Sequence, residues 1–202
     1  MTSFIEYLKE SSDCLYIYDR NFSVYGLENK ERYLIVVKDG WVLPEEWNGL
    51  DNSIYQIIEL KNWFELVLSG ALLPWECACL NKKYVIKEHV KLMMTTKPLE
   101  LRKNLDQEKA ELDASNTTDL MEYWEFIKNI RFAIQIIQNH KIVNFKEAAA
   151  DFSILNNIES EQTPKEYSEF VFNQLKTLTD GMLKKELLEK IKTKYNDTNV
   201  YF

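Results

Sequence analysis

The stretch that decides the fold is Cys14–Lys38, CLYIYDRNFSVYGLENKERYLIVVK. Its two apolar segments, 15–18 and 33–37, consist of β-branched, aromatic and aliphatic residues, which are typical of strands. The residues between them favour turns, notably Asn21, Ser23, Gly26 and Asn29. This pattern predicts two strands joined by a loop that is too long for a tight hairpin, and loops of that size on a sheet often carry a site.

Downstream of this stretch, residues 53–60 predict a third strand that runs into a helix over 61–69, with Gly70 as its C-terminal stop. The remaining chain is dominated by helical spacing of apolar residues and by helix-capping residues. Helices are expected over 3–10, 74–80, 87–94, 99–113, 119–139, 146–155, 164–179 and 183–195.

These elements predict the α+β class, with a small mixed β-sheet and flanking helices followed by an all-helical C-terminal half. The predicted domains are 1–112, an α/β domain, and 113–202, a helical domain. Within this plan Lys82–Lys83 is expected to form a turn, and Asp180–Gly181 is expected to separate the last two helices. The helix over 119–139 is expected to be the longest.

The chain is acidic, with a net charge of −7 over 202 residues. This balance argues against a nucleic-acid surface along the whole chain, because neutralising phosphates requires Lys and Arg. A local excess of basic residues lies between 82 and 103, where Tyr84 and His89 are interleaved. A contact with nucleotide or RNA is therefore considered through Lys82, Lys83, Lys87 and Lys91, with a solvated helix face as the alternative.

The cysteines are an odd number, Cys14, Cys77 and Cys79, and the Cys77-x-Cys79 spacing is too close for the usual zinc motif. No signal-peptide pattern and no long apolar span occurs in the sequence. We therefore expect a cytoplasmic protein with reduced thiols and no membrane contact. No P-loop, Gly-x-Gly-x-x-Gly or Gly-x-Ser-x-Gly motif is present.

Three segments are similar to one known family: Tyr25-Gly26-Leu27 in the loop, 59–70 with the following Glu76, and 128–135. They resemble the predicted nucleotidyltransferases of the DNA polymerase β superfamily, in the bacterial and phage group associated with RNA repair. In that family the loop reads Gly-Ser-x-Ala-Tyr-Gly-Leu and Ser-Asp-x-Asp follows it. The resemblance implies a nucleotidyltransferase-like sheet with a helical second half.

The chain departs from this pattern at every residue that would approach phosphate or metal. Asn21-Phe22 stands in place of Gly-Ser, whose backbone amides hold the nucleotide phosphates in the family. Tyr33-Leu34-Ile35 stands in place of Asp-x-Asp, which presents two carboxylates to Mg²⁺ on one face of a strand. We therefore expect a degenerate active site without catalytic residues, metal ligands or cofactor. Residues that still line the expected cleft are Asn21, Tyr25, Gly26, Tyr33 and Glu59.

Three functions remain open. The first is a nucleotidyltransferase-like protein that has lost metal-dependent nucleotidyl transfer and acts in binding or regulation. The second is an active nucleotidyltransferase that uses Mg²⁺ with relocated carboxylates, drawn from Asp19, Glu28, Glu31, Asp39 and Glu59. The third is an α+β protein-interaction module whose exposed aromatic anchors would be Trp41, Trp47 or Trp75.

Overall fold

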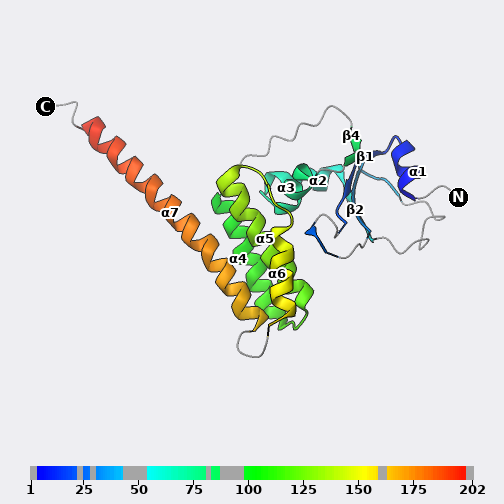
Figure 1. Ribbon diagram of the computed structural model, residues 1–202. Coiled ribbons are helices and arrows are strands. Elements are labelled where there is room, and N and C mark those ends of the chain that lie inside the picture. Colours follow the sequence, from blue (N-terminus) through cyan, green and yellow to red (C-terminus); the bar gives the residue numbers. More distant parts are fainter. Residues whose placement is uncertain are drawn as a thin grey trace.

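The computed structural model describes residues 4–21, 25–27, 31–42, 54–80, 83–86, 98–158 and 163–198. It has the predicted α+β architecture, in which a mixed sheet with flanking helices precedes a helical C-terminal half (Figure 1). The expected helix over 87–94 lies outside the described residues.

The sheet has four strands in the order β3-β2-β1-β4. The central strands β1 (Cys14–Asp19) and β2 (Arg32–Val37) are antiparallel, whereas β3 (Ile54–Glu59) is parallel to β2. The edge strand β4 (Lys83–Ile86) is antiparallel to β1, and Lys83 pairs with Tyr18. The predicted turn at Lys82–Lys83 was therefore wrong at Lys83, because the strand-forming residues that follow it extend the sheet.

Each face of the sheet is covered by helices, which explains the alternation of large apolar residues in the two central strands. On one face, α1 (Phe4–Glu10) packs on an apolar cluster that includes Ile17 and Ile35. On the other face, Trp63 of α2 (Leu60–Leu68) and Cys77 of α3 (Leu72–Cys79) pack on a second cluster. Strand residues of that second cluster are Tyr16, Tyr18, Leu34 and Val36.

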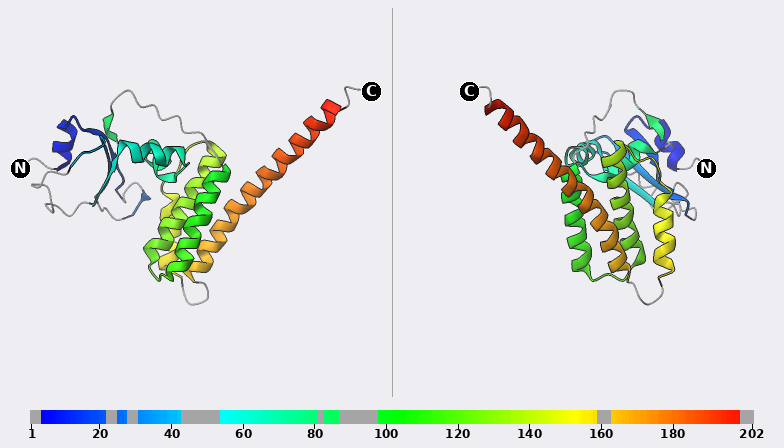
Figure 2. Two further views of the ribbon diagram at one scale, coloured as in Figure 1. Left: turned by 180° about the vertical axis from the view of Figure 1, so that it is seen from behind. Right: turned by 60° about the vertical axis from the view of Figure 1, so that its left-hand side comes forward.

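The helical half is organised around α5 (Leu120–Asn139), which packs against α4 (Pro98–Ser115), α6 (Glu147–Asn156) and α7 (Pro164–Thr198) (Figures 1 and 2). Buried apolar side chains recur along α5 at helical spacing, as the sequence predicts. The helix begins after Asp119, whose side chain accepts a hydrogen bond from the Met121 amide. Because α4 contributes to the same apolar cluster as α5, the predicted boundary at residue 112 falls inside a helix of this bundle.

The prediction of a break at Asp180–Gly181 was wrong, since α7 runs through both residues and, with 35 residues, is longer than α5 with 20. One glycine inside a helix costs only about 1 kcal/mol, which the packed first half of α7 can offset. No side chain lies within 4 Å of the position of a Cβ at Gly181, so the glycine serves no close approach. Met182 still packs on the apolar cluster of the helical half. The C-terminal part of the helix extends past the bundle on the side away from the sheet (Figures 1 and 2).

The described buried side chains of α7 all lie before residue 180, so the part of the helix that extends past the bundle contributes little to it. We expect a chain that ends after Glu186 to keep its midpoint of thermal unfolding within a few degrees. The matched control is Leu175→Ala, which removes a fully buried side chain earlier in the same helix and should cost about 2–5 kcal/mol. A loss of stability in the shortened chain equal to that of the control would contradict this division of α7.

Candidate functional site

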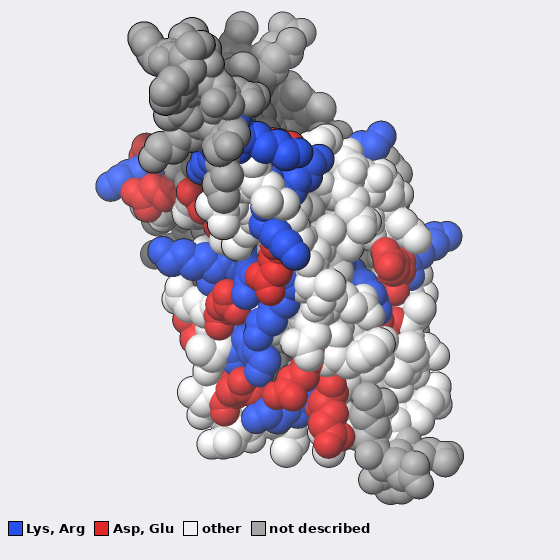
Figure 3. All heavy atoms as spheres, turned by 90° about the vertical axis from the view of Figure 1, so that its left-hand side faces the viewer, with Lys and Arg blue, Asp and Glu red and all other residues white. Residues whose placement is uncertain are grey.

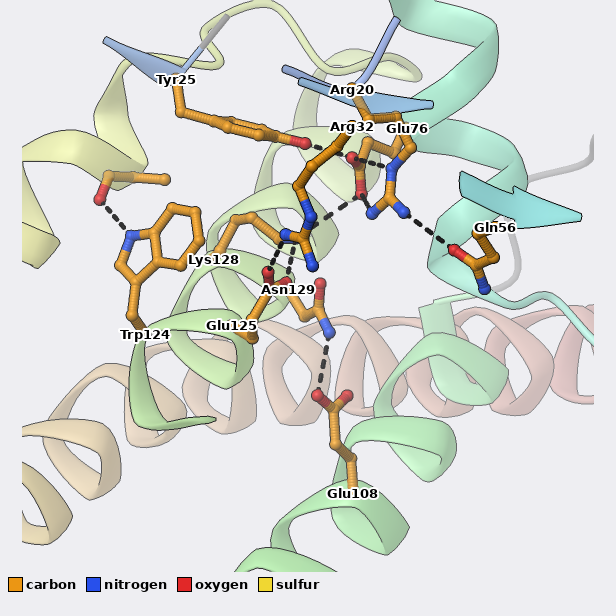
Figure 4. Close-up of polar contacts among 11 residues, drawn as sticks. Arg20, Tyr25, Arg32, Gln56, Glu76, Glu108, Trp124, Glu125, Lys128 and Asn129 are labelled. Atoms are coloured by element: carbon orange, nitrogen blue, oxygen red, sulfur yellow. Dashed lines mark hydrogen bonds and ion pairs between the residues drawn. The ribbon is translucent and has the colours of Figure 1, made fainter. Parts of the chain in front are cut away.

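The centre of the site is Glu76 on α3, a carboxylate that is only 2% exposed. Arg20 binds it with two nitrogens: Nε lies 2.8 Å from Oε1, and Nη2 lies 3.1 Å from Oε2. The Tyr25 hydroxyl donates a hydrogen bond to the same carboxylate, and Lys128 Nζ lies 3.7 Å from Oε2 (Figure 4). Two cations and a phenol therefore converge on one buried anion.

The four side chains come from both halves of the molecule. Arg20 directly follows β1, and its amide donates to the Arg32 carbonyl, which continues the pairing of β1 with β2. Tyr25 comes from the loop, where its ring packs edge-on against Trp124 of the bundle. Lys128 is on α5, only 1% exposed, and its Nζ lies 5.4 Å above the Tyr25 ring. The network thus connects the sheet, the loop, α3 and α5.

Burial alone would raise the pKa of Glu76, but the nearby Lys128 and Arg20 charges outweigh it and lower the pKa from 4.5 to about 2. Hydrogen bonds from Arg20 and Tyr25 act in the same direction. The pKa of Tyr25 is raised well above its ordinary value, first by burial and then by the Glu76 charge. Glu76 is therefore charged and Tyr25 neutral at physiological pH.

A second set of polar contacts surrounds this centre (Figure 4). Glu125, one turn before Lys128 on α5, accepts from Lys128 and from Arg32 Nη1, the latter at 3.2 Å. On α4, Glu108 accepts from Asn129 Nδ2 at 2.9 Å. These contacts place the first residue of β2, α4 and α5 around a common space.

Two cavities open beside the network, with volumes of about 400 Å³ and about 470 Å³. The first lies among the end of α2, α3, α4 and α5, and its wall includes Arg20, Glu76 and Lys128. The second continues between α4 and α5 and reaches Arg32. Because Glu108, Glu111 and Glu125 line both, we treat them as one groove. Each volume lies within the range of small-molecule sites.

Glu108 differs from Glu76 although both face the groove. Its burial raises its pKa from 4.5 to about 7, and the hydrogen bond from Asn129 and the Lys128 charge offset only part of that effect. A substantial fraction of Glu108 is therefore protonated near neutral pH. The groove contains one carboxyl group that changes its charge in the physiological range.

Of the predicted cleft residues, Tyr25 joins the network, whereas Gly26 lies beside it with a positive φ of 83°. A Cβ at Gly26 would lie 3.6 Å from the Ala149 Cβ of α6, so the loop packs closely on the helical half. Asn21 binds the strand ends: its Oδ1 accepts from the Arg32 amide at 2.6 Å. The structure thus places Tyr25 in the network, whereas Gly26 holds the loop on α6 and Asn21 holds it on β2; none of the three lines either cavity.

Tyr33 and Glu59, the other two cleft candidates, lie elsewhere. Tyr33 stacks on Tyr55 and packs on the α1 face of the sheet, away from α3. Glu59 ends β3, where its carboxylate accepts from the Gly40 amide at 3.0 Å. Neither residue lines either cavity.

Three of the carboxylates that relocated catalysis would need are divided between the two ends of β2. Asp19 pairs with Tyr33 at one end of β2, whereas Glu59 pairs with Val37 at the other end. Asp39 lies beside Glu59, where it accepts from the Lys61 amide at the start of α2. A six-residue strand is about 17–20 Å long, so Asp19 cannot share a metal with either of them. Glu28 is outside the described residues.

Within the described ranges, no group of three or more His, Cys, Asp or Glu side chains is arranged to hold a metal ion. The three cysteines are free, and Cys79 Sγ accepts from the Ile142 amide at 3.3 Å. No described helix is long and apolar enough to cross a membrane.

Of the other predicted contact residues, the described tryptophans are buried or partly buried. Trp75 is 8% exposed in the core of the helical half, and Trp41 is partly buried against the α1 face. Trp47, Lys82, Lys87 and Lys91 lie outside the described residues, and Lys83 begins β4. On the face in Figure 3, basic and acidic side chains are intermixed rather than gathered into one basic patch. Nucleotide, RNA or protein contacts stay predictions.

Sequence reasoning found part of this site and missed the rest. The family resemblance included Tyr25, Glu76 and Lys128, which the structure brings together. It also included Arg131, which binds Asp151 with two nitrogens, each at 2.9 Å, and so fixes α6 to α5. Reasoning from sequence missed the partners Arg20, Arg32, Glu108 and Glu125, because charged residues with no motif look like solvated surface.

In comparisons with known proteins, no family model, no curated protein and no solved structure matches the chain.

Replacing Glu76 by Gln should destabilise the protein by about 3–5 kcal/mol, because Arg20 and Lys128 would then be buried without their counter-charge. Urea unfolding near neutral pH measures this loss. The exposed Glu122→Gln on α5 is the control and should stay within about 0.5 kcal/mol of the wild type.

The stability that Glu76→Gln loses should also depend on pH. The pKa of Glu76 is about 2 in the folded protein, against an ordinary value of 4.5. Its contribution to the free energy of unfolding is therefore fully present above pH 4.5 and is lost as pH falls toward 2. The difference between wild type and Glu76→Gln should shrink over that interval. A difference that stays constant with pH would contradict the assignment of Glu76 as a paired anion.

Glu108→Gln should show the opposite dependence on pH. The folded pKa of Glu108, about 7, lies above the ordinary 4.5, so the wild type loses stability from this group as pH rises between those values. The stability of Glu108→Gln relative to wild type should therefore increase from about pH 5 to about pH 8. Urea unfolding across this interval tests it, and a relative stability that does not change with pH would show that Glu108 titrates normally.

Proposed function

We propose that the chain is a nucleotidyltransferase-like protein that has lost metal-dependent nucleotidyl transfer and binds a ligand in the groove between its sheet and its helical half. The observation that carries this proposal is the groove itself, whose wall holds an ion-paired network centred on Glu76. The function is binding or regulation, and no residue is assigned a catalytic role.

The strand that would hold the metal supports the loss of catalysis. Tyr33 and Ile35 occupy the positions that correspond to Asp-x-Asp, and both side chains pack under α1 on an apolar face. A phenol and an alkyl group cannot replace carboxylates as Mg²⁺ ligands. The relocated alternative has little support, because Asp19 lies at the opposite end of the sheet from Asp39 and Glu59, and those two carboxylates accept from the Lys61 and Gly40 amides.

The loop supports the same proposal. A phosphate cradle needs exposed backbone amides that a phosphate can approach. Here the Tyr25 side chain is 1% exposed and Gly26 packs on α6, so this part of the loop is occupied by protein contacts. The interaction-module alternative loses two of its three anchors, since Trp75 is in the core and Trp41 is partly buried.

We further place the protein in the cytoplasm. Three free cysteines, two of them buried, fit a compartment in which thiols remain reduced.

The proposal predicts no turnover of nucleoside triphosphates. Incubation with each labelled triphosphate and Mg²⁺ or Mn²⁺, with an RNA or protein acceptor, should give no labelled product above a heat-denatured sample. A metal-dependent transfer that persists after Glu76→Gln but is lost on replacement of Asp19, Glu31, Asp39 or Glu59 would restore the relocated-carboxylate alternative.

A further inference from the structure

We propose that the groove between α4 and α5 binds a small organic polycation of the linear polyamine class, not a nucleoside triphosphate. This inference rests on the proposed function, because it names the ligand of the same groove. It is carried by the two joined cavities of the groove and by the pairing of the charged residues that line them.

The groove consists of two joined cavities, which gives room for an extended ligand. Its two cavities, about 400 Å³ and about 470 Å³, are joined along one wall by Glu108, Glu111 and Glu125. One end lies at the buried network and the other between α4 and the first turns of α5. A flexible chain with amines at intervals can follow this path and place a charge beside each carboxylate.

The wall has an excess of negative charge. Its cations are Arg20, Arg32 and Lys128, and its acidic residues are Glu76, Glu108, Glu111, Glu122 and Glu125. The cations are engaged with two of these carboxylates: Arg20 and Lys128 pair with Glu76, and Arg32 and Lys128 pair with Glu125. A triphosphate would need cations that already neutralise carboxylates, and breaking a buried pair is costly.

Glu108 and Glu111 have weaker partners. Asn129 Nδ2 donates to Glu108 and Gln107 Nε2 donates to Glu111, each at 2.9 Å. Both donors are neutral amides, so neither carboxylate receives these hydrogen bonds from a cation. An ammonium group therefore gains energy by binding these two carboxylates, which lie one turn apart on α4.

The titration of Glu108 gives this ligand a recognisable signature. Near neutral pH part of Glu108 is protonated, and a cation beside it favours the carboxylate. Binding should therefore release a fraction of a proton, and affinity should rise with pH through about 7. An anionic ligand would have the opposite effect on both quantities.

Isothermal titration with spermidine, and separately with ATP without metal, tests the inference on the full chain. We expect one spermidine per chain, with a binding enthalpy that varies with the ionisation enthalpy of the buffer. The double variant Glu108→Gln/Glu111→Gln should weaken binding by about tenfold for each lost carboxylate. Its control is Glu186→Gln, which removes an exposed acidic residue on α7 outside the groove.

Unchanged spermidine affinity in the double variant, or equal weakening in the control, would overturn the inference. ATP binding without spermidine binding would also overturn it, yet would leave the binding function in place. Metal-dependent triphosphate turnover would instead overturn the proposed function, so the two failures are distinguishable. A double variant that loses its cooperative unfolding is replaced by the single Glu111→Gln, which changes an exposed side chain.

Discussion

The structure depends on one buried carboxylate, Glu76, and on the two cations that hold it. Placing a charged group where only 2% of its surface meets solvent is unfavourable unless opposite charges and hydrogen bonds replace the lost water. Arg20 supplies two hydrogen bonds from the end of β1, and Lys128 supplies a second positive charge from α5. Because these partners belong to different halves of the chain, satisfying one carboxylate fixes the sheet against the bundle.

This constraint also shapes the groove. The loop between β1 and β2 must bring Tyr25 to Glu76, which buries the tyrosine and packs Gly26 against α6. The cations nearest the groove are committed to Glu76 and Glu125, so the carboxylates of α4 set its net charge. The positions that would serve metal-dependent chemistry by resemblance are filled by Tyr33 and Ile35 under α1. One physical requirement thus accounts for the charge of the groove, on which both the proposed binding function and the proposed ligand rest.

The sequence predicted the helices and strands better than the side-chain contacts between them. Strands rich in β-branched and aromatic residues, and the apolar stripe of α5, have local signals strong enough to place them. Gly181 misled the prediction because its cost is small against the packing of Leu175 and its neighbours in α7. Arg20 and Glu125 carried no signal, since an ion pair between residues distant in sequence depends on the tertiary arrangement. Only the family resemblance pointed to Glu76 and Lys128, and it could not show that their side chains form an ion pair.

The most direct test of this account is a double-mutant cycle between Glu76→Gln and Lys128→Met, measured by urea unfolding. If the carboxylate couples the two halves, the cycle should give an interaction energy of about 1–3 kcal/mol. An interaction energy below about 0.5 kcal/mol would mean that the two residues contribute independently. In that case Glu76 would not connect the sheet to the helical half, and the groove would lack the framework on which its proposed function rests.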